Sequence, residues 1–218
     1  MIRQFGWHDL ELLLLAARWT LLLALIAFAG GGIGGLIVAL LRTADNRVGR
    51  ITMTLFIRVF QGTPLLMQLF LAYFGMAIFG FNVNPLIAAM IALTAHASAY
   101  LGEIWRGCIE AVPRGQTEAA TALSLHYAAR MRYVVVPQAA RIAVAPTVGF
   151  LVQLLKETSL TSIIGFVELA REGQIITSVT FRPLLVYGLV AAIYFIMCWP
   201  LSLVAQRMER TLARATRR

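Results

Sequence analysis

The chain has 218 residues, of which 60% are hydrophobic and 13% are charged, and its mean hydropathy is +0.78. A soluble domain has about 25% charged residues, so this composition excludes an ordinary soluble enzyme and indicates a protein that folds in lipid. The net charge of +9 does not indicate nucleic-acid binding, because the basic residues form short clusters between long apolar runs.

Three intervals predict four membrane spans. A helix needs about 20 apolar residues to cross about 30 Å of hydrocarbon. Residues 19–41 carry no charge and predict the first span, and residues 184–205 predict the last. Residues 59–102 carry no charge either and are long enough for two spans, with a turn at residues 80–85, where Gly, Asn and Pro residues gather.

One more span, the fourth along the chain, is predicted before the last one and is irregular. Arg141 and Lys156 bracket an uncharged run that is too short to cross a bilayer as a regular helix. The chain becomes apolar again at residues 160–167, after a polar interruption. The sequence therefore predicts an all-α membrane protein with about five transmembrane helices, forming one membrane domain over residues 1–218.

The basic residues predict the orientation. Fourteen arginines fall on one side of the predicted spans and four on the other, and basic residues in short loops favour the cytoplasm. We therefore expect the N-terminus outside and the C-terminus in the cytoplasm. The larger group consists of Arg42, Arg47, Arg50, Arg58, Arg106, Arg114, Arg130, Arg132, Arg141, Arg207, Arg210, Arg214, Arg217 and Arg218, and the smaller of Arg3, Arg18, Arg171 and Arg182.

The glycine-rich run at residues 30–35 formally satisfies a G-x-G-x-x-G pattern. A nucleotide-binding loop needs a preceding strand and a following acidic residue, and here the run lies inside a predicted span. Gly31 and Gly35 have the small-xxx-small spacing that lets two membrane helices approach closely. We interpret the run as a helix-packing surface.

No phosphate-binding loop is present, since the only lysine, Lys156, is followed by Glu157. No Ser-His-Asp arrangement and no metal-ligand spacing stand out. We therefore predict a non-catalytic subunit that binds no metal and no cofactor of its own.

The segment from residue 113 to residue 137 is the most informative one on the predicted cytoplasmic side. Pro113 and Gly115 mark the start of a helix, with Thr117 as a cap, and strong helix formers follow. Ser124 interrupts this helix, and the chain returns to the membrane at Pro137. From composition alone, an ordinary interfacial helix pair remains the favoured alternative.

The spacing of this segment resembles the loop shared by permease subunits of bacterial ABC importers. In that pattern a glycine usually stands where Ser124 is, and Ile and Leu stand where the valines are. Serine adopts positive φ less readily than glycine. The positions that carry the resemblance, and that it implies contact an ATPase, are Gly115, Glu118, Ala119, Ala120, Ser124, Val134, Val136 and Pro137.

Further segments are similar to the polar amino-acid subfamily, which includes histidine, arginine, glutamine and glutamate importers. They include residues 60–66, 103–107 and 156–160, and the resemblance extends from about Thr20 to Arg210. The family commonly has arginine before its Gly-Thr-Pro, where this chain has Gln61, so a role of that arginine is not carried over.

The resemblance implies a bacterial inner-membrane importer, driven by separate ATP-binding cassette ATPase subunits that hold the ATP and Mg²⁺. It also implies a second permease, identical or a sister, and a periplasmic solute-binding protein, with lipid as the surrounding medium and no nucleic acid. Two alternatives remain open: the same machine carrying a different small solute, and a secondary transporter that works without ATP. A membrane-assembly or channel subunit without a transport cycle is a third.

Charged residues inside a membrane are functional candidates, and broken helices expose backbone groups that bind zwitterions. An amino-acid carboxylate would suit free N–H groups near Thr158, and its ammonium group would suit Glu157. The alternative is that Lys156 pairs with Glu157 or another acid and the break only shapes the pore. Glu103, with Arg106 at i+3, is favoured as a structural pair or gate. The full set of pathway candidates is Gln61, Thr63, Glu103, Lys156, Glu157, Thr158, Ser159 and Leu160.

Overall fold

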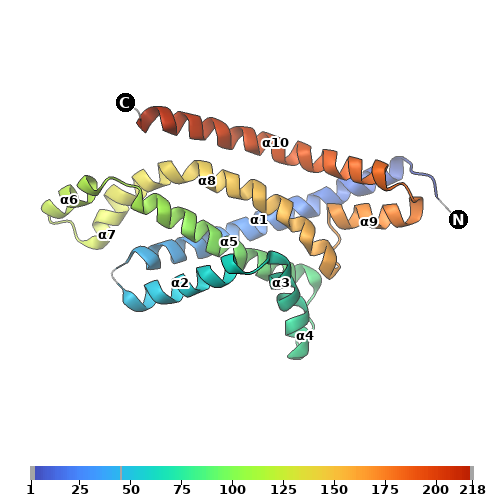
Figure 1. Cartoon of the computed structure of the whole chain (residues 1–218), viewed down its shortest axis with the longest axis horizontal. Helices are drawn as coiled ribbons and strands as arrows, with labels where there is room; N and C mark the ends of the chain where they lie inside the picture. The colour runs from blue at the N-terminus through green and yellow to red at the C-terminus, as the bar shows by residue number, and fades with distance from the viewer. Residues whose placement is uncertain (1–2, 45, 217–218) are drawn as a thin grey trace.

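The computed structural model describes the backbone of residues 3–44 and 46–216, and the side chains of these ranges up to residue 210. Within this part every regular element is helical (Figure 1). The α-helices are α1 (Trp7–Thr43), α2 (Arg47–Gly62), α3 (Leu65–Phe70), α4 (Met76–Ile78), α5 (Pro85–Glu110), α6 (Arg114–Ala122), α7 (Tyr127–Arg130), α8 (Val136–Glu157), α9 (Leu169–Thr180) and α10 (Pro183–Thr216), with π-helical turns η1 (Leu71–Gly75) and η2 (Met131–Val135) and the 3₁₀ helix η3 (Thr158–Ile164).

Four helical segments of the described chain are long and apolar enough to cross a membrane. They are Trp7–Thr43, Pro85–Glu110, Tyr127–Ile164 and Pro183–Arg210. A fifth span results if α2 and the segment Leu65–Ile78 are counted together, although a bend of 104° separates them. The prediction of about five transmembrane helices and no strands is confirmed in this sense.

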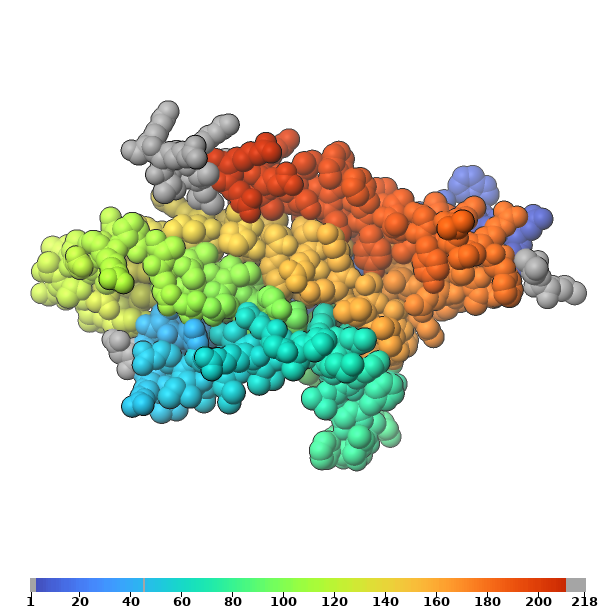
Figure 2. All heavy atoms as spheres, in the orientation of Figure 1, coloured from blue at the N-terminus to red at the C-terminus, as the bar shows by residue number. Residues whose placement is uncertain are grey.

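The bend in the second span follows from its sequence. Thr63 and Pro64 are both extended, with ψ values of 141° and 136°. Proline has no N–H and clashes with a helical predecessor, so it ends the helix that precedes it. The sequence predicted a span in this interval but not its bend, which arises because the helix stops at Gly62. Figure 2 shows the segment after it, in teal and green, standing out from the body of the molecule.

The predicted turn at residues 80–85 is confirmed. Gly80 has a φ of +84°, a conformation that favours glycine. The Asn84 side chain accepts a hydrogen bond from the N–H of Leu86, and Pro85 occupies the first turn of α5. Asparagine caps and first-turn prolines are common helix starts, so this sequence fixes where the third span begins.

Helices α1 and α5 pack closely along the glycine-rich run. A Cβ built on Gly31 would lie 2.3 Å from the Cβ of Ala97, and one built on Gly35 would lie 2.9 Å from the Cβ of Leu101. Ala97 and Leu101 are fully buried. The helix-packing interpretation of the glycines is therefore confirmed, and Gly102 adds the same close approach from the α5 side, against Val38.

The fourth span is longer than predicted. Helical structure runs without a gap from Tyr127 to Ile164, a stretch of 38 residues. Arg141 is exposed within it and does not end the helix. The polar interruption thus lies near one end of the span rather than in its middle, where α8 tightens into η3 and ends at Gly165, with a φ of +88°.

Helix α9 has no counterpart among the predicted elements and is held by a buried acid. The Glu168 carboxylate is fully buried and caps α9 by accepting a hydrogen bond from the N–H of Arg171 at 3.0 Å. It also accepts from the hydroxyls of Tyr194, at 2.8 Å, and Thr20, at 3.2 Å. A buried carboxylate is tolerated when its acceptor positions are filled, so Glu168 ties α9 to α1 and α10.

The two ends of the molecule differ in charge as predicted. The loop between α1 and α2, helices α6 and α7 and the end of α10 lie together at one end, which we call the basic end (Figure 1). The start of α1 and α9 lie at the opposite end. Arg217 and Arg218, and the side chain of Arg214, lie outside the described residues.

Candidate coupling surface and substrate pathway

Helices α6 and α7 form a short hairpin at the basic end. Helix α6 begins after Pro113 without a side-chain cap. Thr117 lies inside the helix, where its carbonyl accepts a hydrogen bond from Thr121, so its predicted role as a cap was wrong. Gly115 is exposed, and no atom lies within 4 Å of a Cβ built on it.

Ser124 makes the break that the sequence predicted. Its φ is +58°, the left-handed conformation that usually favours glycine. The N–H of Leu125 donates to the carbonyl of Ala120 at 3.1 Å, and the N–H of Ser124 donates to that of Thr121 at 2.9 Å. These two bonds form a Schellman cap. The serine therefore supplies the break without a glycine.

The hairpin presents one acidic side chain, Glu118, beside the small side chain of Ala119. Glu118 and Ala119 are exposed, and the Glu118 carboxylate forms no hydrogen bond or ion pair in the described part of the chain. Ala120 points inward and is 3% exposed. Because small side chains permit close approach, this surface can accept another protein that supplies a cation for Glu118.

The hairpin is fixed to the membrane helices by polar and apolar contacts. Arg130 donates to the Thr121 hydroxyl at 3.0 Å, and Gln138 of α8 donates to Gln116 of α6 at 3.3 Å. The other predicted coupling residues form its return to the membrane. Val134 and Val136 are half-buried, Val136 packs against the apolar cluster around Cys108, and Pro137 is exposed in the first turn of α8.

A second group of predicted residues surrounds a cavity at the far end of α8. The cavity has a volume of about 520 Å³ and is lined by Gly149, Val152, Gln153, Lys156, Glu157, Ser159 and Leu160. The Lys156 ammonium group forms no hydrogen bond or ion pair among the described residues, so the predicted alternative of a Lys156–Glu157 pair was wrong. This ammonium group is exposed beside the cavity.

A chain of polar contacts leads from this cavity to the bend in the second span. The side-chain amide of Gln153 donates to Glu157 at 2.8 Å, and the other Glu157 oxygen lies 3.4 Å from Nε2 of His96. Nδ1 of His96 lies 3.2 Å from the side-chain oxygen of Gln68. The amide nitrogen of Gln68 donates to the carbonyl and hydroxyl oxygens of Thr63, both at 3.0 Å.

His96 and Glu157 face each other as two incompletely bonded groups. His96 is 3% exposed, and its ring stacks on Tyr100 with 4.5 Å between ring centroids. Neither its Nε2 nor the facing oxygen of Glu157 has a hydrogen-bond partner by geometry. A buried polar atom without a partner is costly, so this pair can gain a bond when a ligand or a rearrangement brings one.

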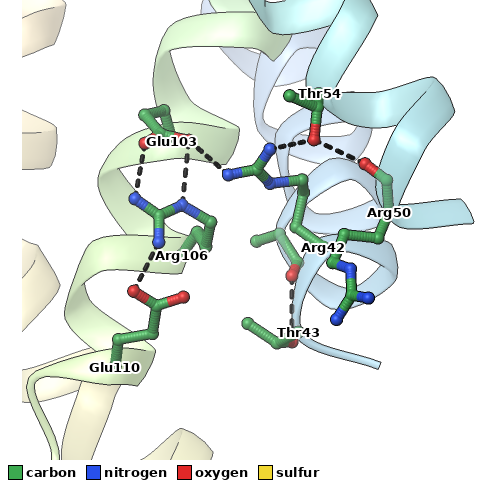
Figure 3. Close-up of polar contacts among 8 residues, drawn as sticks. Arg42, Thr43, Arg50, Thr54, Glu103, Arg106 and Glu110 are labelled. Carbon is green, nitrogen blue, oxygen red and sulfur yellow. Dashed lines mark hydrogen bonds and ion pairs between the residues drawn. The ribbon is translucent and has the colours of Figure 1, made fainter. Parts of the chain in front are cut away.

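Two predicted pathway residues differ from the expectation. The N–H of Thr158 donates to the carbonyl of Leu154, so it is not free for a substrate carboxylate. Gln61 is exposed, does not belong to the chain of polar contacts and does not line the cavity at the end of α8. Glu103 lies instead in an ion network with Arg106, at 2.9 Å, and Arg42, at 3.8 Å (Figure 3), which agrees with its interpretation as a structural pair.

Two residues of the polar chain, His96 and Gln68, had been left out of the candidate set. Each is a polar residue inside an apolar span, and such residues are functional candidates in membranes. Within the part of the chain that the structure describes, no three acidic, histidine or cysteine residues are placed to hold a metal ion. Cys108 and Cys198 are buried, unbridged and packed in separate apolar clusters.

This arrangement of a helical bundle with a short hairpin at one end matches a known family. The inner membrane component of binding-protein-dependent transport systems matches residues 31–218 of the chain. The chain belongs to this family. The permease is therefore a multi-pass inner-membrane component of a transport system, whose work is transport rather than catalysis.

The permease is similar to named transport proteins over most of its length. It is 34% identical over 208 residues to the glutamine transport system permease protein of Escherichia coli (strain K12), covering 94% of this chain and 95% of the relative. It is 36% identical over 197 residues to the L-cystine transport system permease protein of Bacillus subtilis (strain 168), covering 90% and 84%.

Solved structures agree with the fold. A crystal structure of an amino acid ABC transporter with histidines superimposes with a TM-score of 0.87 at 38% identity, covering 92% of this chain and 94% of that one. The inward-facing MetNI methionine ABC transporter gives a TM-score of 0.80 at 19% identity, covering 95% and 99%. The second likeness concerns the fold alone.

Proposed function

We propose that this permease carries a polar amino acid across the bacterial inner membrane in an ATP-driven importer. The observation that supports this most is the exposed, unpaired Glu118 on a capped hairpin at the basic end. The similar permeases are named for glutamine and cystine transport. We take the basic end as cytoplasmic, since basic residues favour that side, and residues 113–137 as the coupling loop of a single domain spanning 1–218.

The partners of the permease follow from the same proposal. ATP-binding cassette ATPase subunits hold ATP and Mg²⁺ and receive Glu118 and Ala119 in a groove. A second permease, identical or a sister, completes the pathway, and a periplasmic solute-binding protein delivers the amino acid. ATP binding drives the cycle only if the ATPase contacts the outward-open and inward-open states differently. In this proposal the hairpin is the surface whose contacts with the ATPase differ between the two states.

The cavity at the end of α8 is the proposed place where the amino acid passes. The Glu157 carboxylate accepts the ammonium group of the substrate, and the Lys156 ammonium group attracts its carboxylate. Both charged groups line the same cavity, and neither is neutralised by the other. Charge-assisted hydrogen bonds of this kind are stronger than neutral ones, so an amino acid would be held by both of its charged groups.

Reversing the charge at Glu118 tests the coupling role. In vesicles containing the permease, its ATPase and its binding protein, Glu118→Lys should lower substrate-stimulated ATP hydrolysis and uptake by at least ~10-fold, a barrier change of about 1.4 kcal/mol. Glu11→Lys is the matched control, because Glu11 is an exposed acid at the opposite end. Equal activity of the two variants would sink the coupling proposal.

Glu157→Gln tests the substrate site. The substitution keeps the size of the side chain and removes its charge, so the substrate concentration for half-maximal uptake should rise by about 10-fold or more, as for one lost charge-assisted bond. Association with the ATPase, measured by co-purification, should not change. An unaltered uptake curve would remove Glu157 from the pathway.

A further inference from the structure

A second cavity lies at the basic end, between the end of α1, α2 and the end of α5. Its volume is about 460 Å³, and we call it the basic cavity. It is lined by Arg42, Arg50, Ile51, Thr54, Leu55, Arg58 and Glu110. It shares no lining residue with the cavity at the end of α8, so what it binds is a separate question from the path of the amino acid.

The acids around the basic cavity are already occupied. Arg106 binds Glu103 through two nitrogens, one of them at 2.9 Å from the carboxylate, and also binds Glu110 (Figure 3). Arg42 donates to Thr54, and a second nitrogen lies 3.8 Å from Glu103. Both carboxylates are therefore engaged by Arg106, and Arg42 is held in place at the wall of the cavity.

Two arginines of the cavity remain without partners. In the described part of the chain, the guanidinium groups of Arg50 and Arg58 form no hydrogen bond or ion pair, and both residues are exposed. The Nε of Arg42 is buried and has no acceptor either. Three arginines with unused donors thus line one cavity, which is an arrangement suited to an oxyanion.

The surroundings of these arginines are apolar. Helix α2 contains no acidic residue, and its arginines run beside a row of exposed aliphatic side chains. Val48, Ile51, Leu55 and Val59 are 71%, 56%, 62% and 49% exposed. Positions three and four apart share one helix face, so the row forms a continuous stripe, and Ile51 and Leu55 also line the cavity. A ligand that matches both surfaces has an anionic head and a hydrocarbon tail.

We propose that the basic cavity binds the headgroup of an anionic phospholipid, with its phosphate among Arg42, Arg50 and Arg58 and its acyl chains along the aliphatic stripe of α2. Basic sites at the cytoplasmic ends of membrane helices attract such lipids. Arg58 lies about 12 Å further along α2 than Arg50, since each residue rises about 1.5 Å. Holding its charge at that depth in the membrane costs free energy, and a bound phosphate offsets this cost. The lipid would fix α2 against α1 and α5.

Lipid titration of purified permease in neutral detergent tests this proposal. The variant Arg50→Gln with Arg58→Gln removes the unpaired charges and leaves Arg42 in its network. The matched control is Arg47→Gln with Arg114→Gln, which removes the same charge from exposed arginines outside the cavity. Binding is measured by native mass spectrometry and by the rise in Tm on adding phosphatidylglycerol or phosphatidylcholine.

We expect the unaltered permease to bind phosphatidylglycerol in preference to phosphatidylcholine. The cavity variant should lose about 30-fold in phosphatidylglycerol affinity, as for two basic groups at an anionic lipid, and the control should change by less than about 3-fold. Inorganic phosphate and glycerol phosphate, which carry the head without tails, should compete only weakly. If the double variant does not fold, Arg58→Gln against Arg47→Gln decides in the same assay.

Three results would overturn the proposal. The first is an equal loss of phosphatidylglycerol affinity in the cavity variant and the control, which indicates that diffuse surface charge attracts the lipid. The second is displacement of the lipid by inorganic phosphate at similar concentration, which indicates a site for free phosphate compounds. The third is loss of co-purifying ATPase in the cavity variant with lipid binding unchanged, which assigns the surface to a protein partner.

Discussion

The contact between α1 and α5 can be tested by adding one methyl group. In Gly31→Ala the new Cβ would lie 2.3 Å from the Cβ of Ala97 and 3.1 Å from its carbonyl carbon. Ordinary contact between such atoms is 3.4–4 Å, so the helices must separate by more than about 1 Å at this point. The surrounding core includes Leu23, Ala27 and Leu93, which are all buried.

The expected loss of stability is a balance of two effects. Overpacking a well-packed core costs about 1–3 kcal/mol, whereas Gly→Ala inside a helix gains up to about 1 kcal/mol in propensity. The net loss is therefore about 0–2 kcal/mol, with the packing effect dominant because Ala97 is fully buried and cannot rotate away. For a chain of this length that corresponds to a fall in Tm of up to about 8 °C.

Thermal unfolding of the detergent-solubilised permease measures this effect, with Gly188→Ala as the control. No atom lies within 4 Å of a Cβ built on Gly188 in α10, so that variant should keep or raise its Tm. Adding Ala97→Gly to Gly31→Ala removes the facing Cβ, so the double variant should recover part of the lost Tm. This recovery measures the coupling between the two positions. The packing argument fails if Gly31→Ala and Gly188→Ala shift the Tm equally.

Substitutions at three further positions test other parts of the structure. Ser124→Gly should keep ATP-dependent uptake, since glycine adopts the required φ, whereas Ser124→Val should lower it several-fold because β-branched residues resist that conformation; uptake in vesicles distinguishes them. His96→Leu should lower uptake more than His96→Gln, which retains a polar group near Glu157, with ATPase co-purification unchanged in both. Glu168→Ala should cost about 3 kcal/mol, measured as a lower Tm, because Tyr194 and Thr20 lose a buried acceptor.

Hydropathy was enough to predict the spans, and the positions of the arginines were enough to predict that one end of the molecule is more basic than the other. It did not predict the bend after Gly62, although Pro64 was visible, because proline marks where a helix stops and not the direction of the next one. Nor did it predict the start of the fourth span. Arg141 was taken as a boundary, but its long side chain reaches the exposed surface from within a helix.

The residues of the coupling hairpin could be predicted from the sequence more fully than those of the substrate pathway. The hairpin is local, so its residues lie within one short segment and its break at Ser124 could be placed from spacing alone. The polar chain from Thr63 to Glu157 joins residues on three different helices. Which faces of those helices meet depends on tertiary packing, and this is why Gln68 and His96 were not among the candidates.

One helix connects the two proposed sites. The coupling motif ends at Pro137, in the first turn of α8, and the same helix ends at Glu157, about 30 Å away along its axis. We infer that a displacement of the hairpin reaches the Glu157 cavity along this single element rather than through loops. Glu118→Lys should then abolish the response of ATP hydrolysis to substrate while leaving the affinity for the amino acid intact. A parallel loss of both would mean that the hairpin shapes the cavity itself and not only its movement.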